Sequence, residues 1–188
     1  MTSKLPYRIV RAQSGIKWYE VARSAGVAMF RGKFETTIDA KGRTSIPAKF
    51  REVLVDTFGD ERFFLTKSSP VPLGDGAFGY GLVIYPYKKF LELEAQLQSG
   101  EGLNLTMAQL AAVKRTVLVP AIECVADKLG RVLVPNDLRK NAFLEREIHF
   151  VGMQTKIDIY SQAVWAKVCE QDEQNYPVDS AALAGLGL

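Results

Sequence analysis

The stretch DAKGRTSIPAKFR, at residues 39–51, decides the fold because it occurs twice. It returns as DKLGRVLVPNDLR at residues 127–139, where the Asp, the Gly, the Arg, the Pro and the final Arg keep their spacing. The offset is 88 residues (127 − 39). Self-similarity of this kind indicates a repeated structural unit. We therefore expect two copies of one small unit.

An aromatic pair extends the match further along the chain. Tyr85 and Phe90 have the same spacing as Tyr160 and Trp165, but here the offset is 75 residues (160 − 85). The first copy therefore carries an insertion of 13 residues (88 − 75) between the matching parts. We assign it to the Gly/Pro-rich stretch at residues 68–81.

Local patterns predict the elements of each copy. Strands are expected at residues 32–38, 44–46, 63–66, 82–85, 148–152 and 157–160. The first two strands would form a hairpin around a three-residue loop at 40–42, with glycine in the left-handed conformation, and the second copy would repeat this loop at 128–130. The fold class is therefore mainly β with short helices (α+β).

Helix starts are marked by proline or by a capping side chain. Two short helices should begin at Pro47 and Pro135, because proline suits the first position of a helix. Pro86 opens a further helix, Asn104 or Thr106 caps another, and Ser161 caps the last. The apolar faces of the two short helices comprise Phe50, Val53 and Leu54 in the first, and Leu138, Ala142 and Phe143 in the second.

Composition excludes several classes of protein. The chain has 188 residues, of which 47% are hydrophobic and 24% charged, so it can bury a core and is not disordered throughout. Its two cysteines, Cys124 and Cys169, form no disulfide framework and no zinc spacing, and we expect packing roles in a reducing cytosol. The single His149 lies in an apolar strand, where we expect it to be partly buried and hydrogen-bonded. No apolar run is long enough to cross a bilayer.

Motifs of common enzymes are missing from the sequence. It contains no GxSxG, HExxH, GxxxxGK[ST] or strand-linked GxGxxG. Neither Asp39 nor Asp127 has a second acid, a metal-ligand set or a nucleophile at motif spacing, so a general-base role is disfavoured. We expect a protein that is not an enzyme and has no cofactor and no metal site.

Charge is distributed unevenly along the chain. Residues 1–28 contain five basic residues and one acidic residue, a net charge of +4, so about −1 remains for the other residues out of a total of +3. Overall charge is thus weak support for nucleic-acid binding. Any such argument depends on local clusters.

The repeated loops support two interpretations. Asp39 and Arg43 flank the first loop on the same face, as do Asp127 and Arg131 in the second, so each pair can form an ion pair that braces its loop. Alternatively, the first hairpin presents a basic tip, because a two-stranded β-ribbon fits the DNA major groove and arginine can address guanine. The cations that cluster around this tip are Arg31, Lys33, Lys41 and Arg43. The second tip has Lys128 but places Leu129 where the first has Lys41, so it is less basic.

These segments also resemble a known family. MFRG at residues 29–32, DAKGRTSIP at 39–47 and DKLGRVLVP at 127–135 are similar to the MraZ transcriptional regulators, of the AbrB-like (SpoVT-AbrB) swapped-hairpin group. The resemblance implies two tandem AbrB-like swapped-hairpin half-units that form a pseudo-symmetric β-barrel. It also implies a first repeat at residues 29–90, a helical connector at 91–118, a second repeat at 119–168 and a tail at 169–188.

The resemblance further implies a function. Family members are cytoplasmic, nucleoid-associated repressors of the cell-division and cell-wall operon that contains their own gene, and they bind promoter direct repeats as rings. Carried over to this sequence, the leading DNA contacts would be Lys41 and Arg43, with Arg31 and Lys33 added from their neighbourhood. The second motif, Asp127 and Arg131, would be structural or lie at a subunit interface. The alternative is a ring-forming scaffold for other proteins without sequence-specific DNA binding.

Both ends depart from this pattern. Family members usually begin at the residue corresponding to Met29, so residues 1–28 are an addition, either a start placed too far upstream or a basic arm. The tail from Pro177 to Leu188 is small and apolar, and we expect it to be loosely held.

Overall fold

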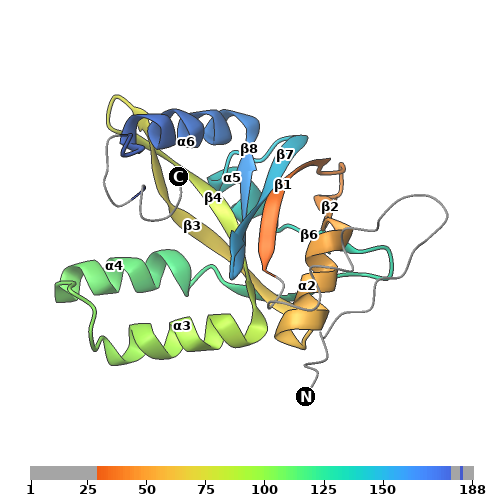
Figure 1. Cartoon of the computed structure of the whole chain (residues 1–188), viewed down its shortest axis with the longest axis horizontal. Helices are drawn as coiled ribbons and strands as arrows, with labels where there is room; N and C mark the ends of the chain where they lie inside the picture. Colours follow the sequence, from red (N-terminus) through yellow and green to blue (C-terminus); the bar gives the residue numbers. More distant parts are fainter. Residues whose placement is uncertain (1–28, 179–182, 184–188) are drawn as a thin grey trace, which may run out of the picture.

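A computed structural model describes residues 29–178 and 183, so the expectations for residues 1–28 and for most of the tail lie outside the described residues. Strands and helices alternate along the chain (Figure 1). In order they are β1 (Phe30–Thr37), β2 (Arg43–Ser45), α2 (Ala48–Phe58), β3 (Arg62–Gly74), β4 (Ala77–Pro86), α3 (Tyr87–Ser99), α4 (Met107–Val117), β5 (Ile122–Val125), β6 (Arg131–Leu133), α5 (Asn136–Asn141), β7 (Glu147–Gln154), β8 (Lys156–Ser161) and α6 (Gln162–Asn175).

Most strands belong to one antiparallel sheet. Its six strands follow the order β1-β7-β8-β4-β3-β5, and β2 and β6 form a separate two-stranded ribbon (Figure 1). Among the described residues the sheet does not close into a barrel. The mainly β, α+β class is therefore confirmed, whereas the barrel is not found.

The two copies of the repeat share this sheet. The first strand of each copy pairs with the third element strand of the other, because β1 pairs with β7 and β5 pairs with β3. The strands β4 and β8 meet at the centre, and β2 pairs with β6. The strand order therefore stays the same when the copies are exchanged, as an internal pseudo-two-fold requires.

This exchange corrects the expected hairpin. Residues 32–38 and 44–46 do form strands next to the predicted loop, but they hardly pair with each other. Only a single bridge joins Ile38 to Thr44, and beyond it β1 and β2 diverge to partners in the other copy. Local periodicity identified the strands but could not identify partners more than 80 residues away.

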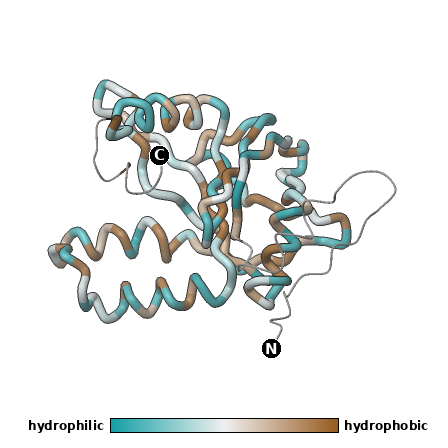
Figure 2. The backbone as a smooth tube through the Cα atoms, in the orientation of Figure 1, coloured by the Kyte–Doolittle hydropathy of each residue, from teal (hydrophilic) through white to brown (hydrophobic). Residues whose placement is uncertain are grey.

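The sheet is covered on both faces, so apolar residues alternate to either side of each strand. In β8, Ile157 and Ile159 enter the main core, which α2, α5 and the β2–β6 ribbon cover. On the other face Tyr160 joins a smaller cluster with Val151, beneath α6. Hydrophobic and hydrophilic segments alternate along α3 and α4, which extend away from the sheet as a helical hairpin (Figures 1 and 2).

The predicted helix starts are confirmed, with a shift of one position at the prolines. Pro47, Pro86 and Pro135 occupy the N-caps of α2, α3 and α5, one residue before the position expected. Thr106 caps α4 in a capping box with Gln109, and the Ser161 hydroxyl accepts a hydrogen bond from an α6 amide. These local signals need no tertiary information.

The 13-residue insertion lengthens one hairpin. The stretch at residues 68–81 forms the outer part of β3 and β4, which continue well beyond the length of β7 and β8. The Ser68 hydroxyl accepts a hydrogen bond from the Gly81 amide at 2.8 Å across this hairpin. Helix α6 lies along it, and the Gln171 side chain donates to the Pro72 carbonyl at 2.7 Å.

Three side chains differ from, or refine, their expected environments. Phe143 was expected on the apolar face of α5, but its backbone turns into the left-handed region (φ 51°) and leaves the ring 55% exposed. His149 is buried as expected, yet its Nδ1 has no hydrogen-bond partner among the described residues. Cys124 packs against the main core, and burial raises the pKa of its thiol to about 11. No helix among the described residues is both long enough and apolar enough to span a membrane.

The close approach of β7 to β1 makes one glycine critical. A Cβ added at Gly152 would lie 2.5 Å from the backbone nitrogen of Arg31. We expect Gly152→Ala to lower the free energy of unfolding by ~2 kcal/mol, because the backbone of β1 would have to shift. At Gly79 the nearest atom is the flexible end of Leu73, at 3.1 Å, so Gly79→Ala should have a smaller effect. Urea denaturation of both variants measures the difference, and equal losses would contradict the assigned contact.

Candidate nucleic-acid interface

The first loop is closed by the side chain of Asp39. Its Oδ1 accepts hydrogen bonds from the backbone N–H groups of Lys41 and Arg43, both at 2.9 Å. Two backbone hydrogen bonds between the ends of the loop, Asp39 N to Arg43 O and Gly42 N to Asp39 O, are each 2.8 Å long. Gly42 has a φ of 82°, as predicted for the left-handed position.

The second oxygen of the same carboxylate holds the Arg43 guanidinium. Oδ2 accepts from Nε at 2.8 Å and lies 2.7 Å from Nη2. Arginine carries five N–H donors, so this contact leaves donors on the outer edge of the guanidinium for a second acceptor. A single carboxylate therefore shapes the loop and orients the arginine.

The second loop repeats this geometry. Asp127 Oδ1 accepts from the backbone N–H groups of Leu129 and Arg131 at 2.9 Å, and Oδ2 accepts from the Arg131 guanidinium at 2.9 Å and 2.7 Å. In the first loop the Arg43 amide and then its guanidinium lower the pKa of Asp39 to about 2. In the second, the Arg131 guanidinium and then its amide lower the pKa of Asp127 to about 2.

The two loops lie side by side because β2 and β6 pair. In this ladder Arg43 is opposite Leu133, Thr44 is opposite Val132 and Ser45 is opposite Arg131. The central pair, Thr44 and Val132, is buried, so the flanking pairs point outward. Both Asp–Arg motifs therefore share one outer face of the ribbon, which local sequence analysis did not predict.

An additional pair of arginines secures the loops. The Arg139 guanidinium lies so close to Gly42 that an added Cβ would be 2.9 Å from its Cζ, and the same holds between Arg51 and Gly130 at 2.6 Å from Nε. Each arginine also donates to a carbonyl of its own copy, Arg51 to Ile46 at 3.3 Å and Arg139 to Val134 at 3.1 Å. We assigned these arginines no role from the sequence, although each is the final residue of the repeated motif.

The other predicted cations lie apart from the loops. Lys41 is exposed at the tip of the first loop, but Arg31 and Lys33 lie along β1. Phe30 and Phe34 contact the main core, so the residues that alternate with them project from the opposite face of the sheet. Lys33 also pairs with Glu35 at 3.2 Å. The fold thus brings Lys41 and Arg43 together, and Arg31 and Lys33 are not beside them.

The outer face combines cations with exposed apolar groups. Lys41, Lys49 and Lys128 are exposed around the loops, and Leu129 and Leu133 are 68% and 57% exposed. A two-stranded ribbon carrying oriented guanidinium groups and flexible lysines can enter a DNA major groove and contact phosphates.

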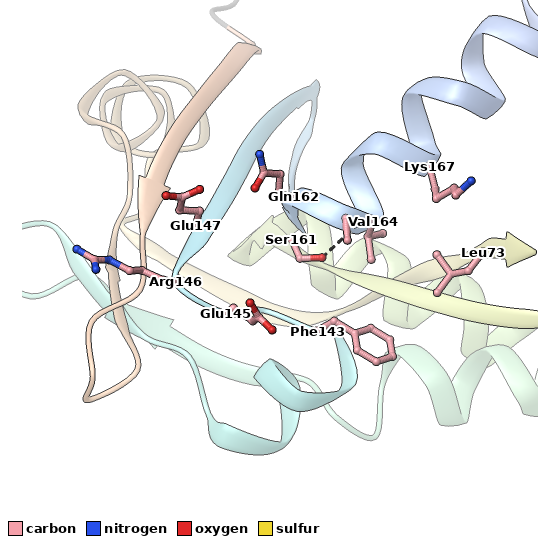
Figure 3. A pocket seen from close by; sticks show the side chains of 10 residues that line it. Leu73, Phe143, Glu145, Arg146, Glu147, Ser161, Gln162, Val164 and Lys167 are labelled. Carbon is pink, nitrogen blue, oxygen red and sulfur yellow. Dashed lines mark hydrogen bonds between the residues drawn. The ribbon is translucent and has the colours of Figure 1, made fainter.

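A separate cavity of about 630 Å³ lies on the α6 side of the sheet (Figure 3). Its apolar part is formed by Leu73, Phe143 and Val164, and no residue of either loop lines it. The Ser161 hydroxyl at its edge accepts a hydrogen bond from the Val164 amide at 3.3 Å (Figure 3). The described residues include no group of three or more His, Cys, Asp or Glu side chains that could hold a metal ion.

Comparison with known proteins gives a consistent result. The family model "MraZ protein, putative antitoxin-like" matches residues 29–68 and 117–184. A "Transcriptional regulator MraZ" of Geobacter sp. (strain M21) is 80% identical over 160 residues, which is 85% of this chain and 100% of the relative. Proteins with the same name from Geotalea uraniireducens (strain Rf4) and Desulfitobacterium hafniense (strain DSM 10664 / DCB-2) are 69% and 36% identical over the same shares of both chains.

The loop carboxylates should titrate far below the usual Asp pKa of 3.8. Because folding lowers both values, the stabilisation is present above pH 3.8 and is lost as the pH falls through about 2. Carboxyl-carbon NMR should therefore show midpoints near 2 for Asp39 and Asp127. Arg131→Ala should raise the Asp127 midpoint more than Arg43→Ala raises that of Asp39, because a backbone amide contributes most at Asp39. Ordinary midpoints in the unsubstituted protein would show that the loops open in solution.

Proposed function

Because the chain belongs to the MraZ family of transcriptional regulators, we propose that it binds DNA sequence-specifically and represses transcription through the face formed by its two Asp–Arg loops. The observation that carries this proposal is the pairing of β2 with β6, which sets Arg43 and Arg131 on one exposed ribbon. Carboxylates hold both guanidinium groups in place before any DNA arrives. Such preorganisation reduces the conformational entropy lost on binding.

The first loop is proposed to make the leading contacts. Arg43 would donate in bidentate fashion to guanine O6 and N7 through its free edge, and Lys41 would meet phosphate. Arg131 contributes less in this proposal, because Leu129 replaces the lysine beside it. Asp39 and Asp127 are positioning residues for the two arginines. Arg31 and Lys33 lie away from the loops, so we propose that they attract phosphates and do not read bases.

We further propose the assembly and biological setting that the family resemblance implies. The chain would comprise two swapped-hairpin half-units (29–90 and 119–168) joined by a connector at 91–118, and the strand exchange between the copies supports this division. Copies of the chain would assemble into a ring in the cytoplasm and bind promoter direct repeats at the nucleoid. The target would be the cell-division and cell-wall operon that contains its own gene.

A titration against the DNA upstream of its own gene tests this function. We expect tighter binding to that fragment than to a scrambled duplex of equal length, and a steep loss of affinity with salt as phosphate contacts release counterions. Fluorescence anisotropy at several salt concentrations measures both. Equal affinity for the two duplexes would exclude sequence-specific regulation and favour a scaffold.

Arg43→Ala should weaken binding to this fragment by about 1–3 kcal/mol per engaged subunit and relax the sequence preference. The melting temperature should change little, because the Asp39–Arg43 pair is largely exposed to solvent. Arg131→Ala is the matched comparison and should have the smaller effect on binding. A variant that melts much earlier but binds normally would make the pair structural, and the reverse order would move the leading contact to the second loop.

Affinity should also depend on assembly. One ribbon covers few base pairs and would bind with a Kd of roughly 10⁻⁴ to 10⁻⁶ M, whereas linked subunits on direct repeats gain about 10² to 10⁴ in avidity. A variant restricted to a monomer, or DNA with altered spacing between repeats, should therefore lose most of the affinity. Anisotropy combined with mass determination in the same buffer is the measurement. Tight binding of a monomer to a single repeat would contradict the role of the ring.

A further inference from the structure

The outer face of the ribbon carries an exposed apolar side chain directly beside the arginine proposed to read guanine. Leu133 is the cross-strand partner of Arg43, and it is 57% exposed. Opposite residues of an antiparallel pair project to the same face, with Cβ atoms about 4.5–5.5 Å apart. Any base pair that Arg43 reaches therefore has Leu133 within one or two base steps.

The core has no use for this leucine. The apolar residues of the ribbon that belong to the main core are Val132 and Val134, which alternate with it and are almost completely buried. Exposure of a large apolar group next to the guanidinium of Arg43 leaves its methyl groups free for an external partner.

The corresponding position in the first copy is different. At the offset of 88 residues, Leu133 corresponds to Ser45 (133 − 88), which lies opposite Arg131. One half of the ribbon thus presents an arginine with an apolar neighbour, and the other presents an arginine with a hydroxyl. The pseudo-two-fold of the fold is broken at the positions that would face the bases.

We infer that Leu133 is a specificity-determining residue that contacts the C5-methyl group of a thymine next to the guanine read by Arg43. This inference rests on the proposed DNA-binding function. In the major groove, thymine is distinguished by its methyl group, which apolar side chains contact, while guanine offers acceptors to arginine. The pair Arg43–Leu133 reads two adjacent bases, and the pair Arg131–Ser45 makes no methyl contact.

Replacing thymine by uracil removes the methyl group and keeps base pairing, so it tests the contact from the DNA side. The upstream fragment is prepared with either thymine or uracil, and each is titrated with the unsubstituted protein and with Leu133→Ala. We expect uracil to weaken binding of the unsubstituted protein about fourfold per contacted methyl group, from ~0.8 kcal/mol per buried carbon. Leu133→Ala should bind thymine DNA with the same loss and show no further loss on uracil DNA.

Leu129→Ala is the matched control, because Leu129 is 68% exposed on the neighbouring loop but lies beside Pro47 and Arg51 in a recess next to β1. This variant should keep the full response to uracil. If Leu133→Ala also keeps it, uracil acts through DNA shape and the inference is wrong. If Leu129→Ala alone abolishes the response, the methyl contact belongs to the second loop tip.

Two further readouts separate the possible failures. A loss of assembly mass in Leu133→Ala, with an unchanged response to uracil, would place Leu133 at a contact between subunits and overturn the inference. Failure of the unsubstituted protein to prefer the upstream fragment over a scrambled duplex would overturn the proposed function itself. A preference that is equal on thymine and uracil DNA would overturn only the role of Leu133.

Discussion

The two loops are held together by reciprocal contacts between a glycine of one copy and an arginine of the other. Arg139 covers Gly42 and Arg51 covers Gly130, and in each case a Cβ would collide with the guanidinium. Across the same junction, Val134 N donates to Gly42 O, and Ile46 N donates to Gly130 O, both at 2.9 Å. Glycine is required at both positions for its positive φ and for the space it leaves. The short ribbon thereby becomes a fixed platform for both Asp–Arg pairs.

Local signals in the sequence predicted the elements well, because their causes lie within a few residues. The Asp–Gly–Arg spacing fixed the loop, prolines marked the starts of α2, α3 and α5, and Thr106 and Ser161 capped α4 and α6. The pairing of β1 with β7 was not predictable in this way, since it joins residues far apart in sequence and depends on the whole core. The expected hairpin and barrel are wrong in the described residues for this reason.

The candidate site was partly predictable for a similar reason. Asp39, Lys41 and Arg43 are neighbours in sequence, so the geometry of their loop followed from the motif. The placement of Arg131 on the same face depended on the β2–β6 ladder, which no local pattern reveals. Conversely, Arg31 and Lys33 are close to the loop in sequence but project from the other face of the sheet, because residues in a strand alternate.

Fusing two units in one chain has a consequence for recognition. A dimer of identical half-units would place the same loop on both sides of an exact two-fold axis and would favour a palindromic site. In the fused chain the halves have diverged on the outer face, where Lys41 and Ser45 correspond to Leu129 and Leu133, whereas the Asp, Gly and Arg residues that build the loops are the same in both. The shared residues preserve the platform, and the divergent residues give it a direction. A directional platform repeated around a ring matches a directional DNA repeat, which is the arrangement that direct repeats provide.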